Sequence, residues 1–416
     1  MRQMKDSGIE WIGDIPEKWS FSKLKYIGNY INGYAFKPDD WGSVGKKIIR
    51  IQDLTGSNDN PNYYNGTIDE KYNVTNGDIL VSWAATLDAF VWSKEDGLLN
   101  QHIFKAVPNE KVERTYFFWL IKEAMKNMNN DNKHGIFMQH VTLDVFNNFS
   151  VPIPPLPEQH LISAYLDRQC TLIDSVIDKT KASIEEYKKL RQAVITQAVT
   201  KGVRGDRAMK DSGIEWIGEI PEEWKPIKIK RLLTEQKDRS ESGEEEPLSM
   251  SQKFGIIPTK KMDIVPNMAS SFVGAKLVCV GDLVFNKLKA HLGVFAVSGY
   301  EGLVSPDYAV YRSTGKANLR FLEYMFKTPQ CINEFKKKST GVGAGLTRLY
   351  TDGLYSIHIP LPPIDEQQEI AAYLDQKCAE IDNLITKKEQ FLTELNTYKK
   401  SLIYEYVTGK KEVPQA

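Results

Sequence analysis

Few stretches of this sequence combine residue types and spacing that suit catalysis. The glycine-rich run from Gly341 to Leu346 resembles a phosphate-binding loop, in which glycines let backbone amides approach a phosphate closely. Leu346 stands where the dinucleotide motif G-x-G-x-x-G needs its third glycine, and no Lys-Ser or Lys-Thr pair follows as a P-loop requires. The run therefore predicts a flexible loop and not a nucleotide site.

Two other patterns are weaker still. Asp307, Glu334 and Lys336 faintly imitate a metal-dependent nuclease, but Glu334 lies in a run that predicts a helix where that pattern needs a strand. The Pro-Pro pairs at 154–155 and 362–363 lack the preceding Asn or Asp of an adenine-methylation motif. We therefore expect no catalytic residue, no metal site and no cofactor bound by this chain itself.

The four cysteines and the first residues bear on the compartment. Cys170, Cys279, Cys331 and Cys378 are scattered singly, without the paired spacing of a zinc site, which favours a reducing cytosol. The start of the chain shows no apolar signal segment, and no stretch approaches 18 apolar residues. We expect a cytoplasmic protein that has no membrane partner.

Clusters of Lys, Arg, Gln and His could instead contact DNA, because such side chains bind base edges and phosphates. Lys and Arg total 54 and so do Asp and Glu, so any basic surface must be local. A single Lys is usually a solvated charge, so only the clusters are interpreted as contacts. The candidates in the first half are Lys46, Lys47, Arg50, Gln52, Lys133, His134, Gln139 and His140. Those in the second half are Gln252, Lys253, Lys260, Lys261, Lys287, Lys289, His291, Lys336, Lys337, Lys338 and Arg348.

Two tryptophans lie near these clusters. Trp41 and Trp83 could stack on bases or wedge beside them. Aromatic residues among strands more often belong to a core, and that alternative stays open.

An internal repeat organises the chain that carries these clusters. Residues 4–19 recur at 209–224 with two differences, an offset of 205, and residues 151–159 recur in similar form at 359–367, an offset of 208. Offsets of this size indicate duplication of a whole unit and exclude a solenoid repeat. Between the repeated phrases the halves diverge, as a reader of two different targets would need, although unequal drift after duplication gives the same pattern.

Two long helices are predicted at 158–200 and 366–408, which contain no Pro or Gly and show a heptad pattern. The apolar stripe along each helix is called here its seam. Polar residues interrupt both seams at corresponding heptad positions, Thr180 with Lys388 and Arg191 with Lys399. Each helix could pair antiparallel with the other about an internal pseudo-twofold axis, pack on its own domain, or pair with a second chain. The spacer residues of the seams are Leu166, Ile173, Ile177, Ile184 and Tyr187, and Leu374, Ile381, Ile385, Leu392, Leu395 and Leu402.

The remaining sequence predicts two mixed domains. Strands are expected at 47–52, 78–83 and 102–107 with a helix at 116–125, and again at 274–280, 282–285, 294–297 and 308–311 with a helix at 319–326. The predicted class is α+β, with two mixed recognition domains in pseudo-twofold arrangement and two long antiparallel coiled-coil helices. The expected segments are a first domain at 1–155, a first helix at 156–204, a second domain at 205–363 and a second helix at 364–416.

These features together resemble the specificity subunit of Type I restriction-modification systems. The resemblance rests on two copies of G-I-x-W-I-G-x-I-P-x-x-W, each leading through a variable domain to P-P-x-x-E-Q and a long helix. Residues 248–256, 305–308 and 341–349 also look like phrases from the recognition domains of that family.

The resemblance implies a non-catalytic subunit that recognises a bipartite double-stranded DNA target. It also implies partners: two modification subunits that methylate adenine with S-adenosylmethionine, and restriction subunits that add ATP- and Mg-dependent translocation and cleavage. An enzyme built from two similar domains, or a scaffold that binds only proteins, remain the rival hypotheses. The first needs a constellation of catalytic residues in both halves, and none is found.

Overall fold

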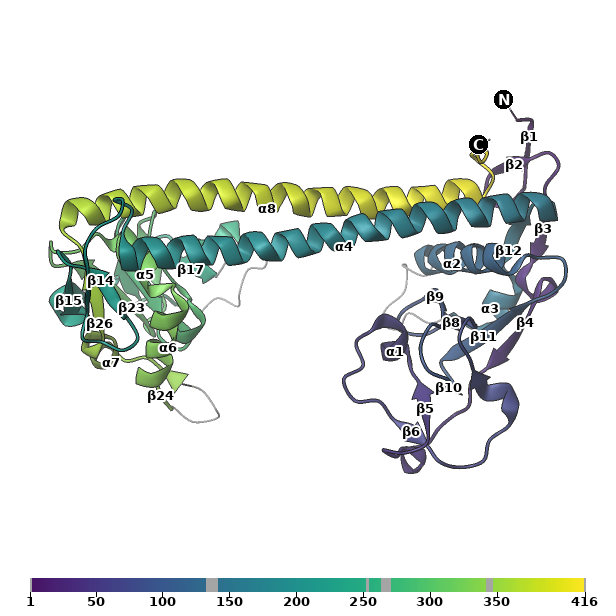
Figure 1. Cartoon of the computed structure of the whole chain (residues 1–416), viewed down its shortest axis with the longest axis horizontal. Coiled ribbons are helices and arrows are strands. Elements are labelled where there is room, and N and C mark those ends of the chain that lie inside the picture. Colours follow the sequence, from purple (N-terminus) through teal and green to yellow (C-terminus); the bar gives the residue numbers. More distant parts are fainter. Residues whose placement is uncertain (1, 132–140, 252–253, 263–270, 342–346, 415–416) are drawn as a thin grey trace. The chain divides into compact units, whose positions relative to one another are not determined.

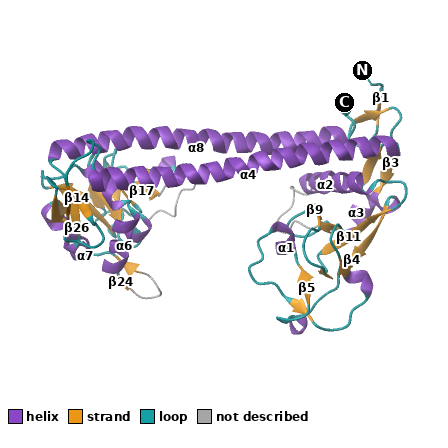
Figure 2. Ribbon diagram, viewed as in Figure 1, coloured by secondary structure: helices purple, strands orange, loops and turns teal. Residues whose placement is uncertain are grey.

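The computed structural model describes residues 2–131, 141–251, 254–262, 271–341 and 347–414 (Figure 1). The chain forms two compact units. The first unit contains Met1–Thr180 and Gln390–Ala416, and the second contains Lys181–Glu389. Both units mix helices and strands (Figure 2), so the predicted α+β class with two similar domains is confirmed.

The first unit is built on two four-stranded sheets. One sheet has the order β4-β11-β8-β9 and is antiparallel, while in the other, β6-β5-β10-β7, strand β10 runs parallel to β5. Helix α2 (Arg114–Asp131) packs against β9 and buries Tyr116, Phe117 and Leu120, which recur at helical spacing. The strands are β4 (Gly28–Asn32), β5 (Lys46–Ile49), β6 (Tyr63–Tyr64), β7 (Asn73–Val74), β8 (Ile79–Ser82), β9 (Asp88–Val91), β10 (Gly97–Leu99) and β11 (Ile103–Pro108).

The second unit repeats this design. Its antiparallel sheet β16-β23-β20-β21 has the same order of corresponding strands, and a parallel bridge from Pro247 to Leu303 corresponds to the β5-β10 pairing. Helix α5 (Leu319–Phe326) covers β21 as α2 covers β9. The strands are β16 (Leu233–Gln236), β17 (Leu248–Ser251), β18 (Gly255–Pro258), β19 (Lys276–Val278), β20 (Leu283–Asn286), β21 (Phe295–Val297), β22 (Gly302–Val304) and β23 (Tyr308–Ser313).

Short elements complete each unit. Strands β1-β2 and β13-β14 form hairpins from the repeated opening phrase, and β3-β12 and β15-β26 tie that phrase to the chain before each long helix. Their bounds are β1 (Met4–Asp6), β2 (Asp14–Pro16), β3 (Ser20–Lys23), β12 (Ser150–Ile153), β13 (Met209–Asp211), β14 (Glu219–Pro221), β15 (Lys225–Lys228), β24 (Thr340–Gly341), β25 (Thr347–Arg348) and β26 (His358–Leu361). The short helices are α1 (Ile51–Thr55), α3 (Leu143–Asn148), α6 (Pro329–Lys338) and α7 (Thr351–Ser356).

Most predicted strands are confirmed within two residues, and one was too long. The expected strand at 47–52 ends at Ile49, because Asp53 accepts a hydrogen bond from the backbone of Arg50 at 2.9 Å and starts helix α1. Arg50 and Gln52 therefore leave the sheet and turn toward the surface.

The two long helices are confirmed as α4 (Leu156–Lys201) and α8 (Ile364–Val407), each beginning two residues before its predicted start. Within the first unit, Tyr165 packs on Tyr406 and Asp174 pairs with Lys399, so the two helical segments run antiparallel. Within the second unit, Tyr187 contacts Lys388 and Arg191 pairs with Asp382, which gives the same direction. The predicted seam residues are all buried or half-buried.

Both cores include parts of both helices. In the first unit Leu402, Ile403 and Val407 of α8 belong to the same buried core as residues of α2. In the second unit Ile195 and Val199 of α4 share a core with Leu374 of α8. No helix in the described ranges has an apolar stretch long enough to cross a membrane.

Candidate nucleic-acid interface

The repeated phrases form one structural joint in each unit. In the first unit, Trp19 Nε1 donates to Glu158 at 2.8 Å, and Arg2 both pairs with Glu158 at 2.5 Å and covers the Trp19 ring. In the second unit, Trp224 donates to Glu366 at 3.0 Å and Arg207 repeats both contacts. These residues fasten the opening phrase to the start of each long helix.

The glutamine of each P-P-x-x-E-Q phrase completes the joint. Gln159 accepts from the backbone of Glu113 at 2.7 Å and donates to the carbonyl of Pro154 at 2.8 Å. Gln367 makes the corresponding bonds with Asn318 and Pro362. Buried polar groups must find such partners, so these repeated residues hold the frame of each unit.

The first unit carries a polar cleft of about 430 Å³, called here the first cleft. It lies where the chain leaves β5 and β10, and its polar lining comes from both segments. Its lining residues are Phe36, Trp41, Arg50, Ile51, Gln52, Thr55, Ser57, Ala85, Thr86, Asn100, Gln101 and His102. Amides, hydroxyls and one guanidinium are the groups that read base edges.

Arg50 is held in one orientation inside this cleft. Its guanidinium lies 4.3 Å from the centre of the Trp41 ring. The side-chain oxygen of Asn62, with its amide turned to satisfy both partners, accepts from Arg50 Nη2 at 2.9 Å and from Nη1 at 3.2 Å. Trp41, which is 44% exposed, therefore packs on an arginine and not in the core, where the sequence alone left it open.

The loop between β8 and β9 forms another wall of the first cleft. Ala85 has a φ of 60°, which is unusual for a residue with a Cβ and is typical of functional sites. Trp83 precedes it, with its ring stacked on Phe104 and edge-on to His102. Its Nε1 is buried and has no hydrogen-bond partner among the residues that the structure describes.

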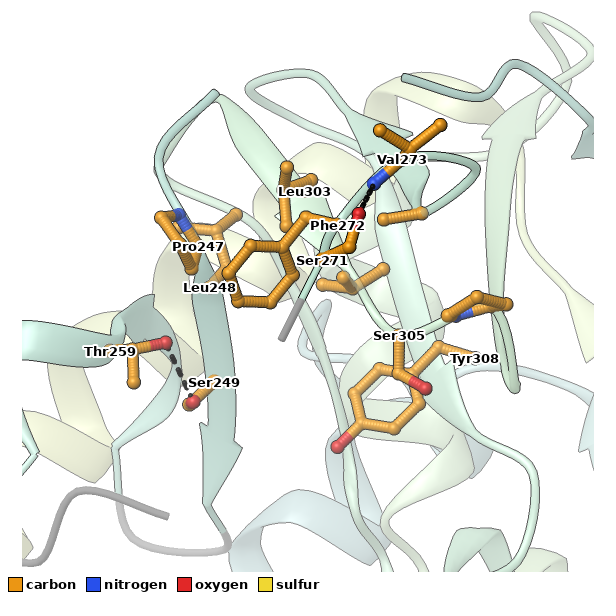
Figure 3. Close-up of a pocket in the computed structure, with 13 residues that line it drawn as sticks. Pro247, Leu248, Ser249, Thr259, Ser271, Phe272, Val273, Leu303, Ser305 and Tyr308 are labelled. Carbon is orange, nitrogen blue, oxygen red and sulfur yellow. Dashed lines mark hydrogen bonds between the residues drawn. The ribbon is translucent and has the colours of Figure 1, made fainter. Parts of the chain in front are cut away.

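The second unit has a cleft of about 330 Å³, called here the second cleft (Figure 3). Its polar groups are hydroxyls, and its other groups are apolar or aromatic. Ser249 and Thr259 share a hydrogen bond of 2.8 Å on one side, while Ser305 and Tyr308 lie on another. Its lining residues are Pro247, Leu248, Ser249, Thr259, Ser271, Phe272, Val273, Ala275, Leu303, Val304, Ser305, Pro306 and Tyr308.

The two clefts occupy the same site in the repeated fold. Leu98 of β10 pairs in parallel with Ile48, and Leu303 of β22 makes a parallel bridge with Pro247. Arg50 and Ser249 each lie two residues beyond those partners, so they correspond. Asn100 and Ser305, which follow β10 and β22, also correspond. One frame therefore presents two different sets of side chains.

The second unit also has a basic surface that contains several predicted contacts. It is called here the hairpin face and consists of Lys289, His291, Lys336, Lys338 and Arg348. The 3-10 turn Ala290–Leu292 contacts α6, and Leu349 N donates to the carbonyl of Lys287 at 3.0 Å. Lys289, Lys336 and Lys338 are exposed there. Arg348 pairs with Asp307 at 3.1 Å, next to the second cleft, and His291 Nδ1 is buried without a partner among the described residues.

Other predicted contacts have their charge engaged within the protein. Lys47 is 13% exposed and bonds Glu95 at 2.9 Å and Asp53 at 3.2 Å; burial lowers its pKa, but these carboxylates raise it above the ordinary value overall. Lys260, Lys287 and Lys337 pair with acidic residues, Lys261 lies over Tyr300, and Lys46 donates to Asn73. Lys47 and Lys287 are therefore mainly structural.

Six predicted contacts lie outside the described residues. They are Lys133, His134, Gln139, His140, Gln252 and Lys253.

Several residues that line the clefts were not predicted from the sequence: Asn100, Gln101 and His102 in the first cleft, and Ser249, Ser305 and Tyr308 in the second. Short polar residues after a strand give no pattern by themselves. Aligning the halves at the offset of 205 would have shown that Asn100-Gln101-His102 and Ser305-Pro306-Asp307 follow equivalent strands.

The described part of the chain holds no group of three or more His, Cys, Asp or Glu placed to bind a metal ion. Within the weak nuclease-like pattern, Asp307 pairs with Arg348, and Glu334 lies on α6 and pairs with Lys337. These two carboxylates are thus occupied by cations of the protein itself.

Sequence comparison finds the same duplication. A family described as "Type I restriction modification DNA specificity domain" matches residues 16–186 and 221–394. The Type I restriction enzyme EcoBI specificity subunit of Escherichia coli is 25% identical, over 98% of this chain and 90% of its own length. The putative Type I restriction enzyme MjaX specificity subunit of Methanocaldococcus jannaschii is 26% identical, over 97% and 96%.

Solved structures share the fold. A chain from a study of complex assembly and conformational transition of the type I R-M system aligns with a TM-score of 0.66 at 16% identity, over 95% of this chain and 99% of that one. The HsdS subunit from Thermoanaerobacter tengcongensis aligns with a TM-score of 0.50 at 17% identity, over 95% and 98%.

Proposed function

The chain belongs to the family of Type I restriction-modification DNA specificity proteins, and from this premise we propose that it reads a bipartite DNA target for a Type I complex. Each unit reads one half of the target, and the two halves differ in sequence. The observation that carries this proposal is the pair of corresponding clefts, one lined by Arg50 and amides and the other by hydroxyls and aromatic rings. Different donor sets at one site select different base pairs.

The same proposal assigns the chemistry to partner subunits. Two modification subunits dock on the chain and methylate adenine with S-adenosylmethionine, and restriction subunits contribute ATP- and Mg-dependent translocation and cleavage. The chain contributes no catalytic residue. The pairing of Asp307 and Glu334 with cations of the chain supports this assignment, as do Leu346 in place of a third glycine and the missing adenine-methylation motif.

A binding experiment tests the proposal against its rivals. The full chain, purified with its modification subunits, is mixed with a pool of random DNA duplexes, and bound duplexes are amplified and sequenced. Enrichment of two short sequences separated by a fixed gap supports a bipartite reader. Binding without enrichment, or no binding, would favour a scaffold that contacts only proteins.

Catalysis by the chain itself is tested separately. Calorimetric titration of the isolated chain with S-adenosylmethionine and with ATP should give no heat of binding. Micromolar binding of either compound would favour an enzyme built from two similar domains.

A further inference from the structure

The side chain of Arg50 is fixed in one orientation and keeps free hydrogen-bond donors, two features that suit contact with a DNA base. Its guanidinium is fixed by the Trp41 ring at 4.3 Å and by the Asn62 amide oxygen, which accepts from Nη2 and Nη1. Arginine has five N–H donors in a rigid plane. Asn62 accepts from the end of the guanidinium, at Nη1 and Nη2. The side edge, formed by Nε–H and the Nη2 hydrogen next to it, has no acceptor among the described residues. A fork with a free edge can bind a partner that offers two parallel acceptors.

Guanine is the base that offers two such acceptors in the major groove, O6 and N7. A phosphate can also accept from an arginine, but the neighbours of Arg50 match a base edge better. Gln52 and Gln101 line the same cleft, and their amides can pair with the adjacent bases. The nearest carboxylate on the same turn, Asp53, is 2% exposed and bonded to backbone and to Lys47, so it does not neutralise Arg50.

The second unit cannot make this contact at the corresponding position. Ser249 stands there, and its hydroxyl is bonded to Thr259 at 2.8 Å. A hydroxyl can donate or accept and does not demand a particular base. Among the described residues that line the second cleft there is no Arg, Lys, Asn or Gln.

We infer that Arg50 is a specificity-determining residue, which reads a guanine in the half of the target recognised by the first unit through its Nε–Nη2 edge. The inference rests on the proposed function. Trp41 and Asn62 are positioning residues for this contact. The half of the target recognised by the second unit carries no guanine requirement at its corresponding position.

The test repeats the selection from random duplexes with variants of the full chain, each purified with the modification subunits. Wild-type protein gives the two half-sequences of the DNA target with which each variant is compared. Arg50→Ala should lose its preference for one guanine in one half, with relative enrichment at that position falling roughly 5- to 150-fold, the effect of one bidentate pair. The other half should be unchanged. Arg50→Lys keeps the charge but not the fork, so it should show the same loss of preference.

Two further variants keep the test decisive. Trp41→Leu leaves Arg50 in the chain and should weaken the preference at the same position, even if Arg50→Ala folds poorly. Lys71→Ala is the matched control, because Lys71 lies in the same unit, is exposed, and contacts its neighbours Asp69 and Tyr72. This variant should enrich the same two half-sequences as wild-type protein.

The outcomes separate the inference from the proposed function. If wild-type protein enriches no sequence, the proposed function fails and the inference fails with it. If wild-type protein enriches two halves and Arg50→Ala keeps every guanine, only the inference is wrong. Full guanine preference in Arg50→Lys would contradict the role of the guanidinium fork. A uniform loss of affinity with no position relaxed would show that Arg50 contacts a phosphate.

Discussion

Lys399 of α8 donates to both carboxylate oxygens of Asp174 of α4, at 2.6 and 2.7 Å. The same contact exists in the second unit, where Arg191 lies 2.9 Å from Asp382. Arg191 and Lys399 are 208 residues apart, and so are Asp174 and Asp382. The polar interruption at Arg191 and Lys399 is therefore one duplicated ion pair, which fixes the register of the helices.

The contribution of this pair to stability can be measured by charge reversal. Because Asp174 is 54% exposed, the pair itself should contribute only about 0.5–1 kcal/mol. Lys399→Glu adds like-charge repulsion and should lower the midpoint of thermal unfolding, and Asp174→Lys combined with Lys399→Glu should recover most of the loss. A double variant no more stable than the single one would mean that the pair does not define the register.

The joint in the second unit should be more sensitive than the joint in the first. Glu366 is 1% exposed and accepts from both Trp224 and Arg207. Among the described carboxylates, Glu366→Gln leaves Arg207 with only the more distant Glu223 at 3.9 Å, at a cost of up to about 3–5 kcal/mol. Glu158 is 25% exposed, so Glu158→Gln should cost less. Urea unfolding of both variants compares them, and an equal loss would contradict the role assigned to burial.

Glu235 makes the stability of the second unit depend on pH. Burial raises the pKa of its carboxyl, but hydrogen bonds from Thr351 and Lys276 lower it below its ordinary value of 4.5 overall. A depressed pKa in the folded state stabilises the fold above the unfolded pKa, and that contribution is lost as pH falls below about 4.5. Glu235→Gln should be less stable than wild-type protein at pH 7. Its free energy of unfolding should also change less than that of wild-type protein between pH 5 and 3. An unchanged acid profile would exclude Glu235 as the cause.

The hairpin face should bind DNA phosphates. Replacing Lys336, Lys338 and Arg348 with Ala should weaken DNA binding by the complex, and the dependence of affinity on salt should fall by about one unit of slope for each phosphate no longer bound. Lys337 pairs with Glu334 at 2.7 Å, so Lys337→Ala should change the slope less. Binding titrations between about 50 and 200 mM salt decide this, and a wild-type slope in the triple variant would make the face ordinary surface.

The helices should set the gap between the two halves of the target. Both helices pass from one unit to the other, α4 after Thr180 and α8 after Glu389. One heptad inserted after Lys181 and another after Glu389 keep the seams in phase and add roughly 10 Å. That length equals about three base pairs at ~3.4 Å each. Sequencing of selected duplexes should show the same halves with about two to four more unspecified base pairs between them; an unchanged gap would contradict the role of the helices.

The frame was predictable because its signals are periodic or repeated. The heptads located α4 and α8 within two residues, and the duplicated phrases indicated two similar halves and contain the residues of both joints. The strand expected at 47–52 ends at Ile49, so the prediction was too long there. A hydrophobic run does not show that the carboxylate of Asp53 caps a helix. Local side-chain chemistry overrode the pattern there.

The candidate interface was predicted less completely, for a geometric reason. Lys47 and Arg50 lie in one cluster in the sequence, yet only Arg50 lines the first cleft, while Lys47 pairs with Asp53 and Glu95. Asn100 and Gln101 follow a strand about fifty residues further along and are brought to Arg50 only by the parallel pairing of β5 with β10. Such pairings cannot be read from residue types.

The division of the chain into units also determines the order in which the protein can mature on the ribosome. The core of the first unit includes Leu402, Ile403 and Val407, so residues 1–180 remain without part of their core until the end of α8 has been synthesised. At about 5–20 residues per second, that interval lasts on the order of tens of seconds. The second unit is a continuous segment and emerges complete before then. Synthesis therefore favours maturation of the second unit before the first.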